Sequence, residues 1–153
     1  MTGTAQVSQF ESHLKYRLKL LELSPSISEE DLSLVWVTPL SRYGDPLWIF
    51  PSEWFAGDPV AIGHRSLNFD VIMPDGLALT SVDHRKLLSS IKRALYSFWR
   101  HPNKHSIDPS TLRAYCNHIR AMARWIIAHR YQAGVRSFAD LNLDDIVEMM
   151  GAI

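Results

Sequence analysis

The sequence has little of several features that mark well-known protein classes. It holds a single cysteine, Cys116, which excludes an internal disulfide and suits a reducing cytoplasm. No apolar run approaches the roughly 20 residues that span a bilayer, and the N-terminus lacks the apolar segment of a signal peptide. Cys-x-x-Cys, His-Glu-x-x-His and Walker-type glycine loops are also missing. These absences predict a soluble cytoplasmic protein without a membrane partner, a cofactor or a recognisable catalytic motif.

Charge is strongly segregated along the chain, although the formal net charge of its 153 residues is zero. Residues 1–83 contain 5 Lys/Arg and 11 Asp/Glu, and residues 137–153 contain four acids and no Lys/Arg. Residues 84–136 contain 11 Lys/Arg and one acid, Asp108, so this block has a net charge of +10. Such a block predicts a polyanionic partner. The alternative is a basic face that the acidic N-terminal part of the same chain covers.

The N-terminal half predicts short elements around turns. A helix over residues 8–23 and a single helical turn after Ser28 come first. Two β-rich runs, residues 34–38 and 47–50, flank a turn cluster and predict a hairpin, and residues 66–73 predict a third strand. Four aromatic residues of this region form either a stacking platform for nucleic-acid bases or, as we favour, the core of a small sheet: Trp36, Trp48, Trp54 and Phe55.

From residue 80 onwards the pattern is helical. Thr80–Asp83 caps a helix over residues 84–100, and Asp108 with Pro109 begins a second helix that runs towards Gly134. Asn142 begins a third helix with acids in its first turn. The expected class is therefore α+β, with an N-terminal helix and small antiparallel sheet over residues 1–79 and a mainly helical region over residues 80–153.

The second helix carries two distinct faces. Its apolar face is expected to enter the core, and a basic and polar stripe lies well away from it. The apolar face comprises Leu112, Tyr115, Cys116, Ile119, Met122, Ala123, Ile126 and Ile127, and the stripe comprises Arg113, Asn117, Arg120 and Arg124. Cys116 is therefore interpreted as a buried core thiol and not as a nucleophile. His101 and His105 have i, i+4 spacing, but Pro102 and the lack of a carboxylate or thiol partner argue against a metal site.

The order of residues after Ser110 resembles one protein family. The residues that carry the resemblance are Thr111, Tyr115, the pair Ile119-Arg120, the pair Trp125-Ile126, Gly134 and the run Leu141–Ile146. In this order and spacing the chain is similar, over residues 66–150, to the N-terminal core-binding domain of tyrosine recombinases, the phage integrase family. The individual motifs are degenerate, so the order carries the likeness.

The resemblance implies a helical SAM-like bundle that forms one jaw of a clamp around duplex DNA, with a separate catalytic domain as the other jaw. The family's catalytic His-x-x-Arg is absent from this sequence. The family's domain also has a fourth helix, whereas the likeness ends within the third. We therefore expect a non-catalytic N-terminal piece of a longer, nucleoid-associated recombinase of a mobile element, which meets its catalytic domain and other recombinase protomers on DNA. Tyr115 is a packing residue in the family pattern, not the nucleophile.

The expected DNA contacts combine phosphate-binding and base-reading side chains. They are Lys86, Arg93, Lys104, Ser110, Thr111, Arg113, Asn117, Arg120 and Arg124. Asn117 is able to pair bidentately with adenine, or simply faces water. The rival hypothesis is a protein-interaction or regulatory domain whose basic face binds an acidic protein. A third hypothesis, an autonomous nuclease or recombinase, requires catalytic groups that the sequence does not show.

Overall fold

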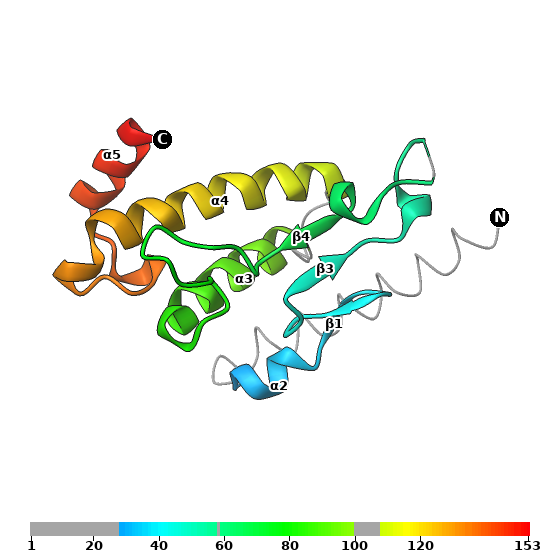
Figure 1. The fold of residues 1–153 in the computed structure, drawn as a ribbon, viewed down its shortest axis with the longest axis horizontal. Helices are drawn as coiled ribbons and strands as arrows, with labels where there is room; N and C mark the ends of the chain where they lie inside the picture. The colour runs from blue at the N-terminus through cyan, green and yellow to red at the C-terminus, as the bar shows by residue number, and fades with distance from the viewer. Residues whose placement is uncertain (1–27, 58, 100–107) are drawn as a thin grey trace.

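The computed structural model describes residues 28–57, 59–99 and 108–153, so the helix expected over residues 8–23 and the loop residues His101, Lys104 and His105 lie outside the described residues. The described part combines helices with two small antiparallel sheets, which confirms the expected mixed class at that level. In Figure 1, α4 (Pro109–His129) runs alongside α3 (Arg85–Trp99), the strands gather towards one end, and α5 (Leu143–Ala152) lies at the other end.

The chain enters the described region through one helical turn, α2 (Glu29–Ser33). The hydroxyl oxygen of Ser28 accepts a hydrogen bond from the N–H of Asp31 at 3.1 Å, which caps the turn as the sequence predicts. Leu32 is buried, and the N–H of Gly44 donates to the main-chain oxygen of Ser33 at 2.9 Å. The turn is therefore fixed on the sheet region by an apolar contact and a main-chain bond.

The strands pair differently from the prediction. β1 (Trp36–Thr38) pairs with β2 (Ser41–Arg42), and β3 (Leu47–Ile49) pairs with β4 (Ser66–Asn68), so the hairpin expected between residues 34–38 and 47–50 is wrong. The side chain of Thr38 explains the difference, because its Oγ1 accepts the N–H of Leu40 at 3.1 Å and turns the chain back immediately. The same Oγ1 donates to the main-chain oxygen of Ile49 at 2.6 Å, so a side chain joins the two sheets.

The third predicted strand is also shorter than expected. Residues 66–73 form a strand only as far as Asn68, whose Oδ1 accepts the N–H of Asp70 at 2.9 Å and starts a turn. Ile72 keeps a single bridge to Ala78. Between these two residues Gly76 has φ of 83°, the left-handed conformation that the predicted turn requires.

The three longer helices begin where their caps predict. Ser81 caps the 3₁₀ turn Val82–His84 that leads into α3, Asp108 accepts the N–H of Ser110 at 2.7 Å at the start of α4, and Asn142 forms a capping box with Asp145 at the start of α5. α4 ends at His129, earlier than predicted, and the 3₁₀ turn Tyr131–Ala133 follows. Gly134, with φ of 91°, ends that turn instead of the helix.

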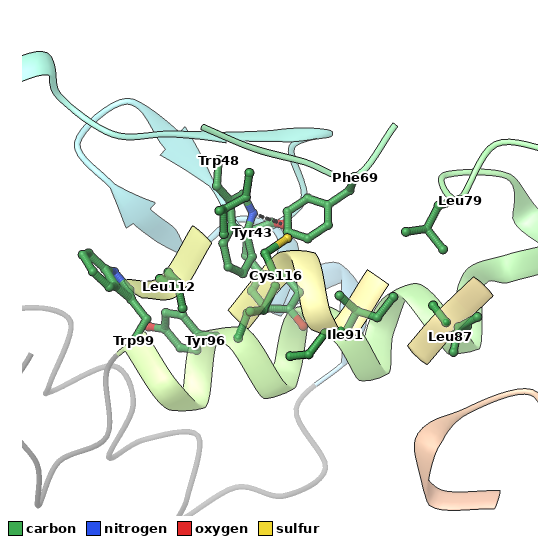
Figure 2. Close-up of a cluster of buried hydrophobic side chains, with 14 of the residues drawn as sticks. Tyr43, Trp48, Phe69, Leu79, Leu87, Ile91, Tyr96, Trp99, Leu112 and Cys116 are labelled. Carbon is green, nitrogen blue, oxygen red and sulfur yellow. Dashed lines mark hydrogen bonds between the residues drawn. The ribbon is translucent and has the colours of Figure 1, made fainter. Parts of the chain in front are cut away.

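A single buried cluster joins the helices to the sheets. It includes Trp48 of β3, Phe69 just after β4, Ile91 of α3 and Leu112 of α4 (Figure 2). The cluster draws residues from both sides of the boundary predicted between residues 79 and 80. Trp48 is buried, while Trp54 and Phe55 are half-buried against the cluster, which confirms the core interpretation of these three aromatics. Trp36 differs, because it is 42% exposed and lies under the guanidinium of Arg42.

Two positions on the long helices differ from a simple division into an apolar buried face and a polar exposed face. Tyr115, expected on the apolar face of α4, is 39% exposed, and its ring contacts that of Phe98 on α3, which is also exposed. Lys92 of α3 is buried and donates to the main-chain oxygens of Tyr43 and Asp45 at 2.8 and 2.9 Å. On α5, Met149 is buried, and four large apolar side chains are exposed: Leu143, Ile146, Val147 and Met150.

Candidate nucleic-acid interface

The outer face of α4 is free of acidic side chains. Ser110, Asn117 and Arg124 recur every seven residues and are all exposed. Because seven residues make nearly two helical turns, these three side chains follow one line along the helix. Ala114 and Ala128 lie beside that line and are exposed as well, so small side chains lie next to its polar groups. A polyanion therefore meets no acidic side chain between Pro109 and His129.

Two arginines of the predicted stripe instead bond to the same chain. Arg113 Nη2 donates to the main-chain oxygen of Gly63, and Arg120 Nη1 donates to the main-chain oxygen of Asn68, both at 3.0 Å. Both residues are half-buried, and both acceptors lie in the segment that carries β4. Within the predicted stripe, then, Arg113 and Arg120 fasten α4 to the sheet region, while Arg124 faces outward.

Asn117 is engaged by its neighbour on the same helix. Its Oδ1 accepts a hydrogen bond from Arg120 Nη2, although the residue as a whole is exposed. Bidentate pairing with adenine uses both the oxygen and the nitrogen of the amide. Base reading by Asn117 therefore requires the bond from Arg120 to open.

The start of α4 presents Ser110 and Thr111 to solvent. Its free N–H groups are partly used, because Asp108 accepts the N–H of Ser110 through its side chain and that of Leu112 through its main chain. The Asp108 carboxylate also adds a negative charge where the helix dipole favours an anion. A phosphate at this end is more easily held by the two hydroxyl groups than by the helix terminus itself.

On α3, the predicted residues Lys86 and Arg93 have different surroundings. Arg93 forms an ion pair with Glu29 of α2. Lys86 is exposed, and its charge contributes to the lowered pKa of Asp140, for which the main-chain hydrogen bond from Arg136 is the main cause. Arg85, which sequence reasoning did not single out, is exposed and makes no hydrogen bond or ion pair to the described residues. Its only signal in the sequence is membership of the basic block.

Some residues of the basic block form ion pairs with acidic residues from other parts of the chain. Arg130 pairs with Asp145 at 2.7 Å and also with Glu148, and its guanidinium lies over the ring of Trp125. The hydrogen bond from Arg130 lowers the pKa of Asp145. The pair between Glu29 and Arg93 is a contact of the kind that the alternative describes, in which the acidic N-terminal part covers the basic block, whereas the partners of Arg130 come from the acidic C-terminal block.

A cluster that sequence reasoning missed joins the start of α3 to the end of α4. His84 is buried; its Nδ1 lies 2.8 Å from the Tyr131 hydroxyl, and its Nε2 lies 2.9 Å from an oxygen of Asp75. Burial raises the pKa of Tyr131. The contact places Arg85 and Lys86, just after His84, at the same end of the molecule as the last turns of α4. The cluster combines three separate segments of the chain, so no local sequence pattern predicts it.

Two further expectations concern reactive groups. Burial raises the pKa of Cys116 to about 11, so its thiol stays protonated at neutral pH and the prediction of a buried core thiol is confirmed. Within residues 28–57, 59–99 and 108–153, no three His, Cys, Asp or Glu residues converge to hold a metal ion. His101 and His105 lie outside those ranges.

Comparison with known proteins adds no relative. No protein-family model, curated protein or solved structure matches this chain. None of the helices in the described ranges combines the length and the apolar character needed to cross a bilayer.

Proposed function

We propose that this chain is a DNA-binding module of a site-specific recombinase of the tyrosine recombinase class, with no catalysis of its own. In this proposal residues 80–153 form the SAM-like core-binding jaw, and the catalytic domain of the parent protein supplies the other jaw around a recombination site. The likeness in sequence after Ser110 supplies the class. The observation that carries DNA binding is the outer face of α4, which is 21 residues long and free of acidic side chains.

The surroundings of each basic residue favour some of the proposed DNA contacts over others. Arg124, Arg85 and Lys86 are exposed and make no hydrogen bond or ion pair to the described residues, so they are available for phosphates without breaking the fold. Ser110 and Thr111 add hydroxyl donors at the start of α4. Arg113 and Arg120 are expected to act mainly by positioning α4, because one guanidinium nitrogen of each already donates to a main-chain oxygen.

A matched pair of arginine variants tests the proposal. Arg124→Gln and Arg42→Gln each remove one exposed positive charge, but Arg42 lies on β2, stacked on Trp36. Binding to a fluorescein-labelled duplex of about 25 base pairs is measured by anisotropy at about 50 mM salt. Arg124→Gln is expected to weaken binding about fivefold and Arg42→Gln by less than twofold, because a lost phosphate contact costs more than a distant charge. Equal effects, or no binding by the unmodified chain, reject the proposal.

A protein-interaction domain with an acidic partner is the second candidate function. One observation favours it: the carboxylate of Glu29 already sits on Arg93 and Ser89, so an acidic side chain fits this face. Single carboxylates from a protein partner are spaced irregularly, whereas DNA offers a regular row of phosphates. A competition experiment distinguishes the two candidates. Unlabelled duplex DNA is expected to displace a DNA-binding module from labelled duplex, whereas polyglutamate at equal charge is expected to do so only weakly.

A further inference from the structure

The acidic turn α2 covers part of the basic face of α3 through one carboxylate oxygen. Glu29 Oε1 accepts hydrogen bonds from Ser89 Oγ and from Arg93 Nε, each at 2.8 Å, and from Arg93 Nη2 as well. Ser89 and Arg93 are four residues apart on α3 and therefore present their donors on the same side of the helix. A single anionic oxygen thus collects three donors from α3.

This contact is built into the fold. Leu32 of α2 is buried, and the N–H of Gly44 bonds to the main-chain oxygen of Ser33, so α2 is held against the sheet region independently of Glu29. A Cβ on Gly44 would lie 2.7 Å from the Cβ of Ser33, which shows how closely the two segments approach. Glu30, the next residue of the turn, is exposed, and its side chain bonds to none of the described residues.

The donors that Glu29 uses are those that a backbone phosphate uses. Arginine nitrogens and a serine hydroxyl are common partners of phosphate oxygens in protein–DNA contacts. The side chains of Arg93 and Glu29 are 45% and 46% exposed, so water and ions reach the pair and weaken it. A phosphate is therefore able to displace Glu29, but it has to compete with it.

We propose that Glu29 is an autoinhibitory side chain: it holds Arg93 and Ser89 away from the DNA backbone and lowers the affinity of this face for duplex DNA. The inference rests on the proposed DNA-binding function and deepens it by assigning regulation to one ion pair. Removal of the Glu29 charge releases Arg93 for one additional phosphate contact. The same reasoning assigns Arg93 little weight in DNA binding as long as Glu29 is present.

The test compares five forms of the full chain on the same labelled duplex at several salt concentrations: unmodified, Glu29→Gln, Glu30→Gln, Arg93→Gln, and Glu29→Gln combined with Arg93→Gln. Glu29→Gln is expected to tighten binding about fivefold and to steepen the slope of log K against log salt by about 0.9, the value for one added phosphate contact. Glu30→Gln, which removes the same charge from the same turn, is expected to change affinity less than twofold and to leave the slope unchanged. Arg93→Gln alone is also expected to stay within about twofold.

The double variant distinguishes two explanations for tighter binding by Glu29→Gln: release of Arg93, or a general loss of negative charge. It is expected to bind no more tightly than Arg93→Gln, because the gain from Glu29→Gln passes through Arg93. Equal tightening by Glu29→Gln and Glu30→Gln, or a gain that survives Arg93→Gln, overturns the inference while DNA binding itself stands. Failure of all five forms to bind overturns the proposed function and the inference together. Thermal unfolding of each variant shows that it is folded at the temperature of the binding assay.

Discussion

Arg120 Nη1 donates a hydrogen bond to the main-chain oxygen of Asn68 over 3.0 Å, and this bond ties the middle of α4 to the end of β4. The sequence assigned Arg120 to DNA, together with Arg124 one turn later. Arg124 is exposed and makes no such bond among the described residues. The two arginines therefore have separate roles, one in the fold and one at the surface, and each role has its own measurement.

The free energy of unfolding is expected to distinguish the role of Arg120 from that of Arg124. Arg120→Ala leaves the Asn68 oxygen without its donor and removes the packed stem of the side chain, so it is expected to lower the free energy of unfolding by about 1–3 kcal/mol. Arg124→Ala is expected to change it by less than about 0.5 kcal/mol. Urea unfolding of both variants measures the difference. Similar values for the two would show that the bond to Asn68 contributes nothing to the fold.

The close approach of Gly44 to Ser33 yields a second prediction. Gly44→Ala places a Cβ 2.7 Å from the Cβ of Ser33 and 3.0 Å from its main-chain oxygen, so α2 has to shift. The expected loss is about 1–3 kcal/mol, as for other overpacked sites. Gly63→Ala is the matched control, because a Cβ there meets nothing within 4 Å. If differential scanning calorimetry gave both variants the same melting temperature, the tight contact between α2 and the sheet region would be refuted.

The starts of the helices could be predicted from capping residues close by in sequence. The pairing of the strands could not, because it depends on residues far apart in the chain. Asp108 with Pro109 and Asn142 with Asp145 mark helix starts through bonds to their own near neighbours, so the sequence suffices. The pairing of β3 with β4 depends instead on burying Trp48 opposite Leu67, across a connection of 16 residues. The hairpin prediction failed because it used adjacency alone and overlooked the turn made by Thr38.

The candidate interface was predictable in the same partial way. The lack of acidic residues along α4 and the exposure of Arg124 follow from helical periodicity. The acceptors that engage Arg113 and Arg120 are main-chain oxygens 50 and 52 residues away in sequence, and a sequence pattern does not reveal such partners. The pairing of Arg93 with Glu29 likewise requires the fold, although the segregated charge indicated that some such pairing was possible.

The buried amine of Lys92 gives a pH dependence. Burial lowers its pKa from 10.5 to about 8, so between pH 8 and pH 10.5 the unfolded chain binds more protons at this residue than the folded chain. Stability is therefore expected to rise with pH across this window, by up to about 3 kcal/mol. The contribution is measured as the difference in unfolding free energy between the unmodified protein and Lys92→Met at each pH. A difference that stays constant from pH 8 to pH 10.5 contradicts the prediction.

The thiol of Cys116 is expected to change stability with pH in the opposite direction to Lys92. Burial raises its pKa from 9.0 to about 11, so between these values the unfolded chain has lost a proton that the folded chain retains. Stability is expected to fall by about 2–3 kcal/mol between pH 9 and pH 11. Cys116→Ala lowers stability at every pH through the smaller side chain, but the fall that is specific to the thiol disappears. Parallel curves for the two proteins over this window would mean that the thiol is not shielded from water.

The proposed phosphate-binding surface is tested by the salt dependence of binding to duplex DNA. Among the Lys and Arg side chains of α3 and α4, three make no hydrogen bond or ion pair to the described residues: Arg85, Lys86 and Arg124. If each meets a phosphate, log K falls against log salt with a slope of about −3 or steeper. We expect binding at about 50 mM salt with that slope. No binding under these conditions, or a slope between zero and about −1, would contradict it.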